Sequence, residues 1–157
     1  MHRRLTTRTL AMAAILSASA LSPAAADAAQ PKAGTYAGKT TQPAAMPFTG
    51  TIGLKVAKLA GGHNLTKVTA RMKLDCQGDP ARVTTLRFAI PAGAAKVSPA
   101  GRFSYRVSTG PTSGFTVKGR FVSRAKATGS FGYSDAHSGC YVGNVKWSAS
   151  LRYGGSR

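Results

Sequence analysis

The amino-acid sequence predicts an all-β protein, an antiparallel sandwich or flattened barrel of about eight strands with one disulfide. Apolar and polar residues alternate along most of the chain, as in strands with one buried and one solvent-facing side. The composition agrees, because the 157 residues include 18 glycines and no glutamate. No proline interrupts an alternating segment, as paired strands require.

The alternating segments define the expected strands. The clearest one runs from Lys67 to Cys76, where even-numbered positions are apolar and odd-numbered positions are polar or charged. The first expected strand has the weakest pattern. In chain order, the expected strands lie near residues 35–40, 48–56, 67–76, 85–90, 102–107, 115–121, 131–133 and 145–151.

The N-terminal residues have the pattern of a cleavable secretory signal peptide. A basic start is followed by an apolar stretch over 9–21 and then by small residues, with cleavage after Ala26 or Ala28. The apolar stretch is shorter than the roughly 20 residues that span a membrane. We therefore expect a secreted protein. Its expected parts are a signal peptide over 1–26, a linker over 27–33, a single β domain over 34–153 and a tail over 154–157.

The two cysteines, Cys76 and Cys140, are expected to pair. An exported chain enters an oxidising compartment, where a disulfide is the ordinary state of two cysteines. A bond between them would close a loop of about 65 residues and restrict the unfolded chain by roughly 4 kcal/mol in the chain-entropy model.

The chain is strongly basic, with 22 lysines and arginines, four acidic residues and a formal net charge of +18. Such a surface attracts polyanions. The basic residues occur singly, on the polar side of the strands. The residues that we expect to form an anion-contacting face are Lys67, Arg71, Lys73, Arg87, Arg102, Arg106, Lys118, Arg120, Lys146 and Arg152.

The aromatic residues alternate with these basic residues, so they belong to the opposite side of the strands. Phe103 and Tyr105, for example, alternate with Arg102 and Arg106. Proteins that bind single-stranded nucleic acid stack bases on aromatic rings that share a face with basic groups. The pattern therefore predicts aromatic residues in the core and no specific nucleic-acid partner.

The densest cluster of reactive residues precedes the last strand and contains Asp135, His137 and Cys140. A structural zinc site would need reduced cysteine and a fourth ligand, for which His63 is the candidate. The order His-Ser-Gly-Cys is similar to the Ser-His-Gly-Cys motif of L,D-transpeptidases, but histidine and serine are transposed and Val142 replaces an arginine. A turn that leads into the last strand, with Cys140 in a disulfide, accounts for the cluster more simply.

No other pattern predicts catalysis. The four aspartates show no spacing that would bring two carboxyl groups together for glycoside hydrolysis. No serine lies in a nucleophile-elbow pattern, and no glycine-rich phosphate loop is present. We therefore predict no catalytic residues, no cofactor and no metal site.

Four segments together resemble a protein family. They are the start Gly34–Thr40, the cysteine that closes the third strand, the hairpin with Gly119–Phe121 and Ala127–Phe131, and the ending Val145–Ala149. In these segments the chain resembles functionally uncharacterised small secreted β-domain proteins of actinomycete-type bacteria. The resemblance covers nearly all of the mature chain. It implies secretion, a β-rich fold and a disulfide, and it implies no activity.

These observations predict a secreted, non-enzymatic basic domain that binds an anionic cell-envelope or extracellular partner, such as a wall polymer, an exopolysaccharide or another exported protein. Two alternatives stay open. One is a secreted hydrolase or transpeptidase that uses His137 and Cys140, and the other is an extracellular protein-interaction or inhibitor module. No transmembrane segment is expected in the mature chain.

Overall fold

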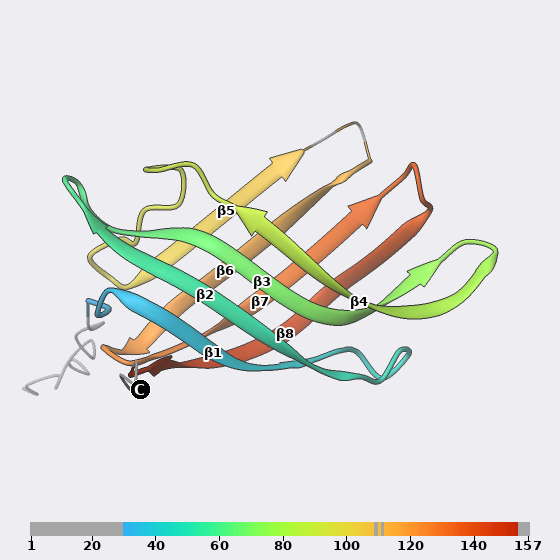
Figure 1. Cartoon of the computed structure of the whole chain (residues 1–157), viewed down its shortest axis with the longest axis horizontal. Coiled ribbons are helices and arrows are strands. Elements are labelled where there is room, and N and C mark those ends of the chain that lie inside the picture. Colours follow the sequence, from blue (N-terminus) through green and yellow to red (C-terminus); the bar gives the residue numbers. More distant parts are fainter. Residues whose placement is uncertain (1–29, 109, 111, 154–157) are drawn as a thin grey trace, which may run out of the picture.

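The computed structural model describes residues 30–108, 110 and 112–153, and all regular structure in this part of the chain is β-strand (Figure 1). The expected signal peptide therefore lies outside the described residues. In the described part, no helix is long and apolar enough to cross a membrane. The strands are β1 (Gly34–Thr41), β2 (Thr49–Leu59), β3 (Gly62–Cys76), β4 (Asp79–Ala89), β5 (Arg102–Ser108), β6 (Gly114–Ser123), β7 (Lys126–Asp135) and β8 (Cys140–Arg152).

The strands form one antiparallel sheet with the order β4-β3-β2-β1-β8-β7-β6-β5. Strands β1 to β4 are consecutive hairpins, and so are β5 to β8. Pairing of β1 with β8 joins the two halves, and it places β4 and β5 at the two edges of the sheet. The architecture is that of an up-and-down barrel that stays open between β4 and β5.

The sheet folds over so that its two halves form two layers, with β1 to β4 in front of β5 to β8 in Figure 1. Apolar side chains from both halves fill the space between the layers. Phe88 of β4 stacks on Phe115 of β6, with ring centroids 3.7 Å apart. Tyr36 of β1 meets Phe121 of β6 edge to face, at 5.3 Å between centroids. The core therefore lies between the layers, and each layer has an outer surface that points away from the other.

The loop between β4 and β5 partly covers the open side. Ala95 accepts a hydrogen bond from the backbone N–H of Leu65, and Val97 donates one to the carbonyl of His63. Ala95 and Val97 are buried, at 1 % and 8 % exposed, so they extend the core at this end. Lys96, which lies between them, is exposed. The loop is thus held beside the start of β3, where Lys96 forms an isolated antiparallel bridge with Asn64.

The structure confirms the predicted all-β antiparallel fold and the Cys76–Cys140 disulfide. The predicted burial of aromatic residues is confirmed as well, since Phe103 and Trp147 are 5 % and 4 % exposed. The two layers belong to one continuous sheet, and alternation alone does not reveal this because it specifies faces and not strand neighbours.

Several strands begin earlier than alternation predicts. β3 starts at Gly62 because its first residues pair with the end of β2, and β8 starts at Cys140 because it pairs there with β7 and β3. β4 begins at Asp79, whereas alternation predicts a strand near residues 85–90, so Pro80 belongs to a strand. A proline is tolerated there because β4 is an edge strand and the proline lies near its start.

Candidate anion-binding surfaces

The outer surface of β5 to β8 carries two rows of basic and hydroxyl side chains. Cross-strand pairing aligns the first row across β5, β6, β7 and β8, and it aligns the second row two residues further along. The first row is Arg102, Arg120, Thr128 and Ser148, and the second is Ser104, Lys118, Ser130 and Lys146. Since successive side chains on a strand point to opposite faces, both rows point away from the core.

The surface between these rows forms an open hollow of about 880 Å³, which we call the β5–β8 hollow. Its cationic residues come from β5, β6, β8 and the β4–β5 loop, and hydroxyl groups of β5 and β7 lie among them. The cations are Lys96, Arg102, Lys118, Arg120 and Lys146, and the hydroxyl-bearing residues are Ser104, Thr128 and Ser130. All five cationic side chains are exposed.

The floor of the hollow is a third row, formed by Phe103, Gly119, Gly129 and Trp147. The side chains of Phe103 and Trp147 face the core. The two glycines leave room for the indole of Trp147 to lie along the inner side of the sheet. A Cβ at Gly119 would come within 2.7 Å of both Phe103 and Trp147. The Phe103 and Trp147 rings stack with centroids 6.1 Å apart. Packing on the core side therefore fixes the strands that carry the cations.

The described carboxylates do not neutralise this surface. Asp75 accepts a hydrogen bond from Tyr141 Oη at 2.8 Å, and Asp135 accepts bonds from the Ser138 hydroxyl and from the His137 N–H. Neither aspartate lines the hollow. The positive charge of the hollow is therefore open to an anion from solution.

Two of the cations oppose each other directly. Arg102 and Arg120 are cross-strand partners, and such partners have Cβ atoms about 5 Å apart. Like charges at this spacing destabilise a sheet. An anion that bridges the two guanidinium groups would remove the repulsion, and arginine forms paired hydrogen bonds to carboxylate and phosphate oxygens.

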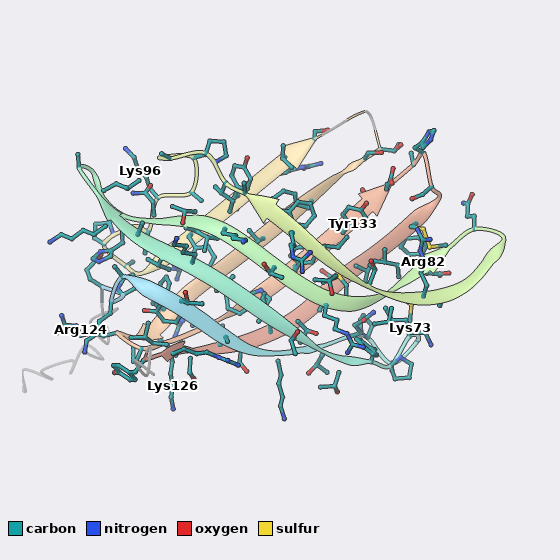
Figure 2. The ribbon with its side chains drawn as sticks, in the orientation of Figure 1. Lys73, Arg82, Lys96, Arg124, Lys126 and Tyr133 are labelled. Atoms are coloured by element: carbon teal, nitrogen blue, oxygen red, sulfur yellow. A yellow bond between two sulfur atoms is a disulfide. The ribbon has the colours of Figure 1, made fainter. Side chains whose placement is uncertain are left out.

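A smaller hollow of about 370 Å³ adjoins the first one on the same outer surface. The two share Thr128, and the adjoining hollow adds the cations Lys39 of β1 and Lys126 of β7. Ser148 and Ser150 add hydroxyl groups. Figure 2 shows Lys126 pointing away from the sheet. Basic and hydroxyl groups thus continue from β5 across to β1.

The predicted anion-contacting residues do not lie on a single surface. Because the sheet folds over, they divide between the outer surfaces of the two layers. Arg102, Lys118, Arg120 and Lys146 lie together in the β5–β8 hollow, Arg106 lies further along β5, and Arg152 lies near the end of β8. Lys67, Arg71, Lys73 and Arg87 belong to β3 and β4 in the other layer.

The sequence reasoning missed three cations of these hollows, namely Lys96, Lys39 and Lys126. Lys39 occurs in the strand with the weakest pattern, and Lys126 precedes the segment that was expected to be β7. Lys96 lies in the loop between β4 and β5, and its Nζ would be 3.6 Å from a Cβ on Gly61 in the β2–β3 turn. Figure 2 shows it beside that turn. No short-range pattern indicates this position.

The cluster around Cys140 has no free thiol. Cys76 and Cys140 face each other across the β3–β8 pairing, with Cα atoms 4.0 Å apart, and their sulfurs are bonded. A cysteine nucleophile must be a thiolate, which a disulfide does not provide. Figure 2 shows Arg82 beside the disulfide, with Nη2 3.8 Å from Cys140 Sγ.

The other polar groups of this cluster make local hydrogen bonds. The hydrogen bond from the Ser138 hydroxyl lowers the pKa of Asp135. The hydrogen bond from the backbone N–H of His137 lowers this pKa further, by a smaller amount. The hydrogen bond to Asp75 raises the pKa of Tyr141. His63 lies in β3 and pairs with Lys58. Among residues 30–108, 110 and 112–153, no three His, Cys, Asp or Glu side chains are placed to hold a metal ion.

Comparison with known proteins gives no relative. No protein-family model, curated protein or solved structure matches the chain.

Proposed function

We propose that this protein is an exported, non-enzymatic domain that binds an anionic polymer at the cell envelope or outside the cell, through the β5–β8 hollow. The observation that carries the proposal is the gathering of five cations around one hollow that no described carboxylate lines. The disulfide supports export, because such bonds persist in oxidising compartments. The signal-peptide pattern of residues 1–26 supports it as well.

The arrangement favours a polymer over a single small anion. Four adjacent strands extend over about 14 Å, since neighbouring strands lie about 4.8 Å apart. One phosphate or carboxylate group cannot contact cations over that span, because each hydrogen bond is only about 3 Å long. A chain with repeated oxyanion groups can do so, and the adjoining hollow with Lys39 and Lys126 extends its path. The hydroxyl groups between the cations supply further donors.

The proposal is tested by removing charge from the hollow. A variant with Lys118→Thr, Arg120→Thr and Lys146→Thr, which we call the hollow variant, places a residue with good strand propensity at each site. We expect its affinity for long-chain polyphosphate at about 50 mM salt to fall by at least about tenfold, because fewer counterions are released on binding. The measurement is a titration that is repeated with polygalacturonate, so that phosphate and carboxylate polymers are compared.

The control variant carries the same loss of charge at exposed sites outside both hollows, with Lys32→Thr, Lys58→Thr and Arg124→Thr. We expect the affinity of the control variant to change by less than about threefold. Its three cations do not contact the bound polymer and attract it only through the overall electrostatic field of the protein. An equal loss in both variants would show that net charge alone causes binding. Failure of the native protein to bind either polymer would reject the proposed function.

A further inference from the structure

The outer surface of the other layer carries a second group of cations. Lys55 of β2, Lys67 of β3 and Arg87 of β4 are all exposed, and we call them the β2–β4 triad. They alternate with buried residues such as Leu54 and Val68, so they point away from the core. The two layers enclose the core between them, so their outer surfaces point in opposite directions (Figure 1). The triad therefore faces away from the β5–β8 hollow.

The triad repeats the main electrostatic feature of the hollow. Lys55 and Lys67 are direct cross-strand partners, as Arg102 and Arg120 are on the opposite surface. Arg87 pairs with Thr69, which makes it the diagonal neighbour of Lys67. Like charges in direct opposition destabilise a sheet, and diagonal neighbours remain within reach of long side chains. Both outer surfaces thus hold cations in repulsive contact that a bridging anion would relieve.

No carboxylate among the described side chains pairs with the triad. The described carboxylate on this side of β3 is Asp75, eight residues from Lys67, or about 26 Å along an extended strand. Asp75 is also engaged by Tyr141. Of the other outward neighbours of the triad on β2 and β3, Gly53 and Thr69 are neutral, and Arg71, the second diagonal neighbour of Arg87, is a further exposed cation. As in the hollow, the charge is open to an external anion.

We propose that one molecule of this protein binds two anionic polymer chains at once, one in the β5–β8 hollow and one on the β2–β4 triad, and so cross-links them. The inference rests on the proposed function and adds a second, weaker site to it, since the triad has three cations and the hollow has five. Two surfaces that face in opposite directions hold separate chains apart by the thickness of the domain. A cross-linker of this kind would join neighbouring polymers in a matrix.

A bridging assay tests the cross-link. Long-chain polyphosphate is fixed to beads, the mature protein is added and the excess is removed, and fluorescently labelled polyphosphate is then supplied. We expect the native protein to be retained and to capture labelled chains. A triad variant, with Lys55→Thr, Lys67→Thr and Arg87→Thr, is expected to be retained within about threefold of the native level, because its hollow is intact, and to lose at least about nine-tenths of the capture.

The control variant with Lys32→Thr, Lys58→Thr and Arg124→Thr has the same net charge as the triad variant and should capture labelled chains as the native protein does. Capture by the triad variant at the native level, as bridging through a second copy of the chain would produce, overturns the inference. Native protein that is retained but captures nothing also overturns it, because one chain then wraps around both surfaces. Native protein that is not retained at all rejects the proposed function instead.

Discussion

Replacing both Cys76 and Cys140 with alanine is expected to lower the free energy of unfolding by about 4 kcal/mol. The disulfide joins residues 64 positions apart, so its loss releases a long loop in the unfolded chain. It also joins β3 directly to β8 at the end of the sheet, where those strands pair over only two residues. For a domain whose net stability is about 5–15 kcal/mol, this is a large fraction.

The measurement is denaturant unfolding of the native protein and of the double variant, with and without a reducing agent. The native protein in reducing agent should approach the stability of the variant, and the variant itself should not respond to reduction. A difference of less than about 1 kcal/mol between the two oxidised proteins would contradict the account of the disulfide.

Gly129→Ala is expected to lower the free energy of unfolding by about 2–3 kcal/mol. A Cβ at this position would overlap the carbonyl oxygen of Lys118 and the indole of Trp147. Relief of the overlap requires the buried indole or the β6–β7 pairing to move. Alanine also lowers the backbone entropy of the unfolded chain, which stabilises the folded state by only about 0.4–1 kcal/mol.

Gly143→Ala is the matched control for this substitution. Gly143 also lies in a strand, β8, but a Cβ there would meet no atom within 4 Å. The free energy of unfolding of the Gly143→Ala variant should differ from that of the native protein by less than about 0.5 kcal/mol. Thermal or denaturant unfolding of both variants measures the difference, and equal effects would contradict the role of Gly129 in seating Trp147.

Strands with large apolar residues are predictable from the sequence. β7 shows why alternation predicts only part of some other strands. Alternation predicted residues 131–133, whereas β7 extends from Lys126 to Asp135. Its inward position at Gly129 carries no apolar side chain, because the indole of Trp147 from the neighbouring strand fills that space. A pattern read along one strand cannot detect a core position that another strand occupies.

The sequence predicts on which side of the strands the cations lie, but it does not predict which cations gather in one hollow. The alternation in β5 and β6 correctly placed Arg102 and Arg120 outside and Phe103 inside. Which cations gather depends on strand order and register, and these are long-range properties. Lys96 reaches the hollow because the backbone pairing of its loop with β3 holds it there.

The most direct test of the proposed function is the salt dependence of polyphosphate binding. Each cation that neutralises a phosphate on a flexible single chain contributes about −0.7 to the slope of log K against log salt concentration. The five cations of the hollow contribute about −3.5 to this slope, and the hollow variant, which keeps two of them, retains about −1.4 of that contribution, so its slope should be shallower than that of the native protein by about 2.1. Equal slopes for the two proteins would contradict binding in the β5–β8 hollow.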